Sequence, residues 1–131
     1  MASAFVNKEF LDSCKSGNVG RLKEIYNPST KSNINIDFVD DKGKTGFIHS
    51  IEMNYREIAN FLIEQQCDVN VKDVEGKNAL HYAADAQPEN KQLILFLLMN
   101  GCDSSNTDAS GKVPGAEKGN IRLFIEDVDC A

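Results

Sequence analysis

The chain has 131 residues, of which 41% are hydrophobic and 26% are charged, a composition typical of one globular domain rather than a disordered segment. The formal net charge of −6 disfavours nucleic-acid and anionic-membrane partners, because an acidic chain repels phosphate groups. The longest apolar run, residues 93–99, is far shorter than the roughly 20 residues of a membrane-spanning helix, so we expect no membrane segment.

Neither the first residues nor the cysteines indicate secretion. Residues 1–5 lack the basic lead and the apolar core of a signal peptide. The cysteines are widely spaced and form no Cys-x-x-Cys pair, which favours free thiols in a reducing compartment. We therefore expect a soluble monomer in the cytoplasm or the nucleus. The cysteines are Cys14, Cys67, Cys102 and Cys130.

Two short helices are predicted near the start of the chain. The apolar residues of segments 10–14 and 19–25 recur at helical spacing, and Gly17 separates the two segments. The polar stretch 27–33 that follows is predicted to be an extended loop. Together these segments indicate a short helical unit at the N-terminal end.

A motif of the form Asp-x-x-Gly-Lys then occurs three times, at residues 40–44, 73–77 and 108–112. Its glycines, Gly43, Gly76 and Gly111, are separated by steps of 33 and then 35 residues. Self-similarity at such a step indicates a repeat architecture, which is the main signal in this sequence. Glycine permits a tight turn at each opening.

Each of the first two openings is followed by a pair of predicted helices. After the first opening these are 47–51 and 58–62, separated by Asn54, a residue that tolerates the left-handed conformation at helix ends. After the second they are 80–84 and 93–98, with a longer break at Gln87-Pro88 between them. The last opening leaves too little chain for a full first helix, and a single amphipathic helix is predicted over 121–128.

These residues resemble the ankyrin repeat, whose pattern is roughly D-x-x-G-x-T-P-L-H-x-A-A, a turn, a helix with I-V-x-x-L-L, and a final G-A-D-V-N. The resemblance implies an all-α ankyrin-repeat solenoid of helix-turn-helix units with β-hairpin-like finger loops. It implies one domain over residues 1–131, with about four repeats (7–39, 40–72, 73–107 and 108–131) and degenerate capping repeats at both ends. The match is fullest at Asp73, Gly76, Leu80, His81, Ala83, Ala84, Leu93, Ile94, Leu97, Leu98, Gly101 and Asp103.

The repeat over 40–72 departs from the family pattern at its first helix. Gly46 stands where the family has proline, and Ile48 stands where it has histidine, with His49 one position further on. Loss of the Thr-Pro start is expected to weaken helix initiation here. This repeat is therefore predicted to be the softest, with amides less protected from hydrogen exchange than those of repeat 73–107.

No catalytic, cofactor-binding or metal-binding site is predicted, and the chain is not expected to be an enzyme. Residues 43–45 end like a phosphate-binding loop, but Phe38 occupies the position of that loop's first glycine. Neither His49 nor His81 has a cysteine or carboxylate at metal-ligand spacing. The resemblance gives His81 a structural role, tying the helix start to the hairpin. At Asn70 it raises the possibility of hydroxylation, although a structural role is the default.

In ankyrin proteins the fingers and first helices line a concave face on which partners dock. The resemblance therefore implies a protein- or peptide-binding face here, with a lysine after each finger glycine, carboxylates beside the lysines, and apolar contacts between them. A mixed face of this kind suits a partner with charges of both signs. The expected contact residues are Asp41, Lys42, Lys44, Glu52, Met53, Val74, Glu75, Lys77, Asp85, Ala86 and Lys112.

The expected function is that of a scaffold, adaptor or inhibitor that binds a protein partner. A first alternative follows from the layout, which is similar to that of a small free-standing ankyrin protein that regulates actin-capping protein. A second class of alternative is a small-ligand-binding protein or a fragment of a larger enzyme. A shallow solenoid groove argues against the first of these, and predicted capping helices at both ends argue against the second.

Overall fold

The computed structural model describes residues 2–85, 91–103 and 106–112. Within these ranges the chain forms α-helices, one short 3-10 helix and no β-strand, and a single isolated β-bridge joins Val39 to Thr45. The helices are α1 (Ala2–Ser16), α2 (Val19–Ile25), η1 (Lys31–Asn33), α3 (Gly46–Glu52), α4 (Arg56–Glu64), α5 (Ala79–Asp85) and α6 (Lys91–Met99).

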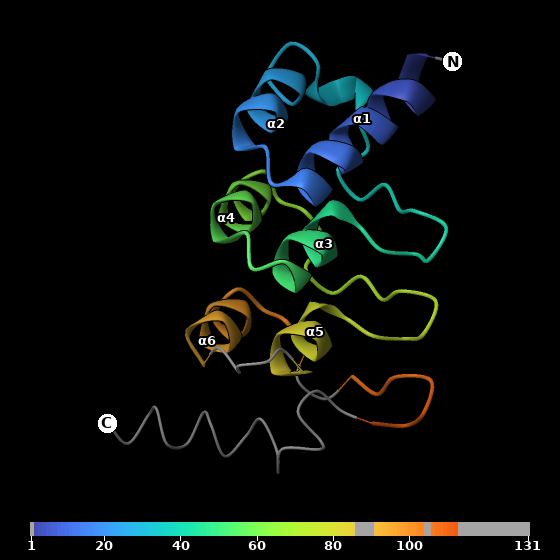
Figure 1. The fold of residues 1–131 in the computed structure, drawn as a ribbon, viewed down its shortest axis with the longest axis vertical. Helices are drawn as coiled ribbons and strands as arrows, with labels where there is room; N and C mark the ends of the chain where they lie inside the picture. Colours follow the sequence, from blue (N-terminus) through green and yellow to red (C-terminus); the bar gives the residue numbers. More distant parts are fainter. Residues whose placement is uncertain (1, 86–90, 104–105, 113–131) are drawn as a thin grey trace.

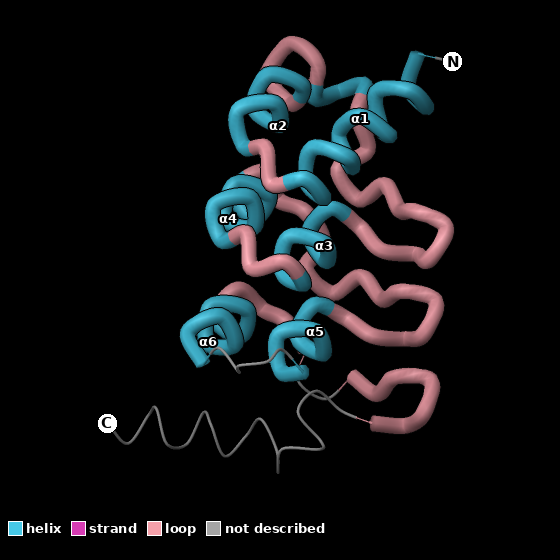
Figure 2. Tube along the Cα trace, viewed as in Figure 1, coloured by secondary structure: helices cyan, strands magenta, loops and turns pink. Residues whose placement is uncertain are grey.

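The helices are stacked in antiparallel pairs, α1 with α2, α3 with α4, and α5 with α6 (Figure 1). The first helices form one row, in which α1 packs on α3 and α3 packs on α5. Long loops project beyond this row on the side away from the second helices (Figure 2). This is the predicted all-α solenoid of helix-turn-helix units with finger loops. The helix predicted over 121–128 lies outside the described residues.

The N-terminal part of the structure differs from the sequence prediction at two places. The first helix begins at Ala2 rather than near Phe10. The loop over 27–33 is compact rather than extended, and it contains η1. Side-chain hydrogen bonds close it: the Thr30 hydroxyl donates to the Ile25 carbonyl, and Asn27 Oδ1 accepts from the backbone N–H of Ser29 at 2.8 Å. Such local side-chain bonds favour turns over extended chain.

A continuous apolar core runs between the two rows of helices, and three of the four cysteines belong to it. Cys14, Cys67 and Cys102 are buried free thiols, as predicted, and Cys130 lies outside the described residues. Burial raises the pKa of each buried thiol from 9.0 to about 12. The largest fully buried apolar side chains are those of Phe10, Leu22, Phe47, Ile48, Ile58, Leu62, Leu80, Leu93 and Leu97.

The unusual glycine at the start of α3 has a packing reason. A Cβ atom added at Gly46 would lie 2.7 Å from the Sγ atom of Cys14 in α1, which is closer than real atoms approach. The helix is nevertheless capped, because the Thr45 hydroxyl accepts from the backbone N–H of Ile48 at 3.2 Å. Gly46 therefore lets α1 and α3 approach closely around Cys14. The relative softness of this repeat stays a prediction.

We expect Gly46→Ala to lower the free energy of unfolding by about 2 kcal/mol, because the added methyl group overpacks the contact with Cys14. Its cost should be smaller in a Cys14→Ala background, where Sγ is absent. The control is Gly20→Ala in α2, where the new Cβ meets only Asn18 Oδ1 at an ordinary 3.6 Å. That substitution should stabilise by about 0.5 kcal/mol through helix propensity. Urea denaturation followed by circular dichroism measures the parent chain, the three single variants and the double variant; equal effects at Gly46 and Gly20 would contradict the packing explanation.

Among the described residues, a residue in the left-handed conformation ends a helix at four places. Gly17 and Gly101 have φ of 77° and 91°, and Asn54 has φ of 60°, as predicted for residues that stop helices. The fourth is Gln66, with φ of 65° after α4. Glutamine has a Cβ that crowds the following carbonyl in this conformation, so Gln66 holds backbone strain that glycine would avoid.

We expect Gln66→Gly to raise the free energy of unfolding by about 0.5 kcal/mol, since relief of left-handed strain outweighs the added freedom of the unfolded chain. Gln65→Gly is the matched control. Gln65 has φ of −86°, so glycine there relieves no strain and should lower stability. Thermal unfolding of the two variants beside the parent chain gives the comparison, and a lower Tm for Gln66→Gly would refute the strain.

Candidate protein-binding face

Three fingers with the same internal geometry form one side of the stack. In each, the backbone N–H of the aspartate donates to the carbonyl of the lysine four residues later, at 2.9–3.1 Å. The aspartate side chain accepts in turn from the backbone N–H of that lysine at 3.0 Å. The finger glycines have φ of 77°, 77° and 81°, which confirms the predicted tight turns. These fingers are residues 40–44, 73–77 and 108–112.

Backbone hydrogen bonds join each finger to the next. The N–H of Val74 donates to the Lys42 carbonyl at 3.0 Å, and the N–H of Ala109 donates to the Glu75 carbonyl at 2.7 Å. A Cβ at Gly43 would lie 3.0 Å from the Val74 nitrogen, so the glycine also permits this close approach. The fingers together with α3 and α5 therefore make one continuous surface, which we call the finger face.

In α3 and in α5, one side chain holds the aspartate of the finger that precedes the helix. In α3 the His49 Nε2 atom lies 2.8 Å from Asp40 Oδ2, and in α5 the Tyr82 hydroxyl donates to Asp73 Oδ2. His49 and Tyr82 occupy corresponding positions, six residues after the finger glycine. His49, which is displaced by one position from the histidine of the family pattern, thus contacts the aspartate of its own finger rather than the next finger.

His81 instead connects two repeats. It is buried, its Nδ1 atom lies 2.9 Å from Asn78 Oδ1, and its Nε2 atom lies 3.0 Å from the Lys112 carbonyl oxygen of the next finger. These contacts tie the start of α5 to the following hairpin, which is the structural role that the resemblance implies. Among the described residues no group of three or more His, Cys, Asp or Glu side chains could hold a metal ion.

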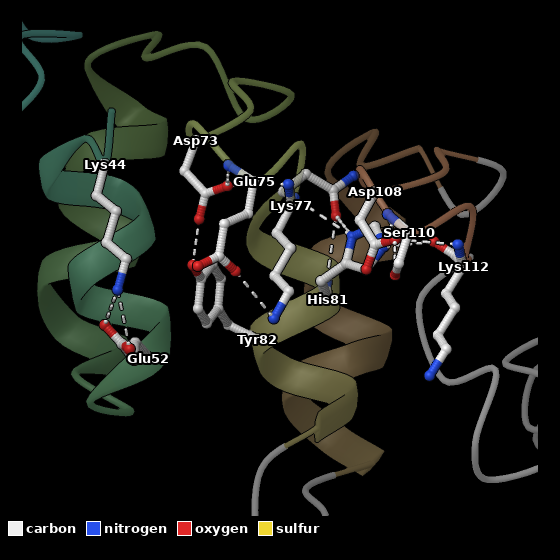
Figure 3. Close-up of polar contacts among 11 residues, drawn as sticks. Lys44, Glu52, Asp73, Glu75, Lys77, His81, Tyr82, Asp108, Ser110 and Lys112 are labelled. Atoms are coloured by element: carbon white, nitrogen blue, oxygen red, sulfur yellow. Dashed lines mark hydrogen bonds and ion pairs between the residues drawn. The ribbon is translucent and has the colours of Figure 1, made fainter. Parts of the chain in front are cut away.

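Two lysine–glutamate ion pairs lie along the finger face (Figure 3). Lys44 Nζ is 3.2 Å from Glu52 Oε2, and Lys77 Nζ is 3.4 Å from Glu75 Oε2. Both ammonium groups also approach the Tyr82 ring, at 4.9 Å and 6.0 Å from its centroid. Tyr82 therefore stands at the centre of the face, although the sequence interpretation did not include it.

The remaining predicted contact residues are exposed wherever they are described. Asp41, Lys42 and Lys112 are exposed finger residues, whereas the Asp85 side chain and Ala86 lie outside the described part of the structure. Met53 and Val74 are two of the large exposed hydrophobic residues. Met53 follows α3 and Val74 belongs to the second finger, so they come from different parts of the face rather than one patch.

The aspartates of the first and third fingers, Asp40 and Asp108, have lowered pKa values. Burial raises the pKa of Asp40, but hydrogen bonds from Lys44, His49 and Lys42 outweigh it and hold the net pKa below its ordinary value. Hydrogen bonds from the Ser110 hydroxyl and from the Lys112 and Ser110 backbone lower the pKa of Asp108 to about 2. These carboxylates therefore keep the finger turns closed at neutral pH.

Asn70 connects the loops behind the fingers. Its Nδ2 group donates to the Gly101 carbonyl at 3.1 Å, and its Oδ1 atom accepts from the Asp103 backbone N–H at 2.8 Å. Both ends of the amide are thus engaged in holding two successive repeats together.

In the described part of the chain, no helix has the length and apolar character needed to cross a membrane.

Comparison with known proteins agrees with this architecture. A family model described as ankyrin repeats, in three copies, matches residues 10–108, which include the three helix pairs apart from the first part of α1, and the first two fingers. No curated protein matches the chain.

Proposed function

The chain belongs to the ankyrin-repeat family, and from this premise we propose that it is a binding module whose protein partner docks on the finger face. Repeats of this family generally mediate protein–protein interaction and are typically not enzymes. We propose accordingly that the chain acts as an adaptor or inhibitor without catalysis of its own. Its buried free thiols fit a reducing compartment, which supports our proposal of a location in the cytoplasm or the nucleus. We propose also that the chain is a monomer.

The observation that carries this proposal is the preorganisation of the finger face. The tips of successive fingers are joined by backbone hydrogen bonds, and the base of each of the first two is fixed by a side chain from its own first helix. A surface that is already ordered loses little conformational entropy when a partner binds. Exposed side chains of both charge signs and of apolar character stand on this ordered backbone and are available for contact.

Capture of partners from a cell lysate, compared between two variants, tests the proposal. The partners retained by the parent chain should be lost by the face variant and kept by the control variant, which carries substitutions on the second helices. Circular dichroism confirms that both are folded. The face variant is Lys42→Ala, Met53→Ala, Val74→Ala and Glu75→Ala; the control variant is Glu24→Ala, Glu57→Ala, Asn60→Ala and Glu64→Ala.

The outcome also shows which surface binds the partner and whether the partner is actin-capping protein. Partners lost only by the face variant support docking on the finger face, and actin-capping protein among them would give the chain a regulatory role like that of myotrophin. Partners kept by both variants, or lost by the control alone, would place the interaction on another surface and overturn the proposal.

A further inference from the structure

The two ion pairs of the finger face share one polarity. The side chain of Lys44 is 15% exposed and that of its partner Glu52 is 36% exposed. The side chain of Lys77 is 31% exposed and that of Glu75 is 65% exposed. In both pairs the carboxylate is the more accessible member, so an approaching molecule meets negative charge first.

Tyr82 explains why the lysines are withdrawn. Its hydroxyl is fixed by the buried Asp73, and its ring receives the ammonium groups of Lys44 and Lys77 from two different fingers (Figure 3). A cation over an aromatic ring is attracted by the ring's negative face, and this attraction adds to that of the paired carboxylate. The charges of the lysines that follow the first two finger glycines are thus already paired within the protein.

We infer that the finger face selects a partner segment rich in basic side chains, an inference that rests on the proposed function and names its class of partner. An arginine or lysine of the partner reaches Glu52 and Glu75 on their exposed sides without displacing the lysines that already bind them. An acidic segment would have to remove Lys44 from Glu52, although that lysine is the less accessible member of the pair. The sequence predicts a partner with charges of both signs, and this inference narrows that prediction to a binding segment that is mainly basic.

Some charges away from the two pairs act in the same direction, and two finger lysines oppose it. Asp41 is exposed on the first finger, and the net charge of −6 attracts a cationic partner over a longer range. The opposing charges are those of Lys42 and Lys112, which are exposed on the first and third fingers and repel such a partner. Neutralising Lys42 and neutralising the glutamates should therefore change the affinity for a basic peptide in opposite directions.

Fluorescence anisotropy with two short labelled peptides, one alternating arginine with serine and the other glutamate with serine, tests the inference on the full chain. We expect the arginine peptide to bind the parent chain and the glutamate peptide to bind less well. Glu52→Gln with Glu75→Gln should weaken the arginine peptide roughly fivefold, and Lys42→Gln should strengthen it about twofold. The matched control, Glu24→Gln with Glu64→Gln on the second helices, makes the same change in net charge and should weaken binding less.

Two results would overturn the inference. Equal weakening by the face and control pairs would show attraction to net charge alone. Tighter binding of the glutamate peptide, lost on Lys44→Gln with Lys77→Gln, would show that the face selects acidic partners, and the proposed function would stand without this inference. The proposed function itself fails separately, when natural partners captured from lysate do not depend on the finger face.

Discussion

Replacing Phe47 with alanine is expected to lower the free energy of unfolding by about 4 kcal/mol. Phe47 is 1% exposed and lies in α3, the first helix that packs on both α1 and α5. Loss of its ring removes apolar area from the core and leaves a cavity that the helices fill only in part. Because domains of this size have only about 5–15 kcal/mol of total stability, the variant should be largely destabilised at body temperature.

The matched control is Phe5→Ala, the same chemical change in α1 at a side chain that is 66% exposed. It should change stability by less than about 0.5 kcal/mol. Urea unfolding followed by circular dichroism gives both values. If the two substitutions cost the same, the core does not run through α3 as the structure shows.

Raising the pH above 9 is expected to destabilise the fold steeply. Burial raises the pKa of the Cys14, Cys67 and Cys102 thiols from 9.0 to about 12, so the unfolded chain loses these protons at lower pH than the folded chain. Their contribution to stability is fully present below pH 9 and is lost as the pH rises toward 12. The expected loss is about 1 kcal/mol per pH unit for each thiol across this window.

Urea titrations in the presence of a reductant, at a series of pH values on either side of 9, measure this loss. The control is a chain in which Cys14, Cys67 and Cys102 are all alanine. It should be less stable at neutral pH, because core volume is lost, but its stability should fall less steeply as the solution becomes alkaline. Tyr26 and Tyr82, whose pKa values burial also raises, remain in both chains and account for the residual slope. Parallel curves for the two chains would mean that the thiols ionise equally well in the folded state.

The sequence predicts the fold well where its signal is local. The repeated Asp-x-x-Gly-Lys motif places the fingers, and Asn54 and Gly101 mark helix ends, because one residue's backbone preference decides each of these features. The left-handed conformation of Gln66 is not predicted for the same reason in reverse, since glutamine carries no local preference for it. The start of α1 was likewise placed too late, because the apolar pattern before Phe10 is weak.

The candidate site depends on contacts between repeats, which local patterns do not encode. The finger residues Asp41, Lys42 and Val74 are exposed as expected from their turn positions. Tyr82 was missed because its importance comes from Lys44, 38 positions earlier, whose ammonium group reaches the ring only after the repeats stack. A faint signal existed: Tyr82 fills the unassigned position between the histidine and the alanines of the family pattern.

The single hydrogen bond between successive finger tips has a mechanical consequence. On the helical side adjacent repeats share a continuous core, whereas on the finger side the described tips are joined by one backbone hydrogen bond at each step. Parting two finger tips therefore breaks a hydrogen bond worth about 1 kcal/mol, while parting the helices would expose the core. Bending that separates the finger tips is therefore expected to cost less free energy than bending that separates the helices, and the curvature of the stack is expected to adjust to a bound partner by movement on the finger side.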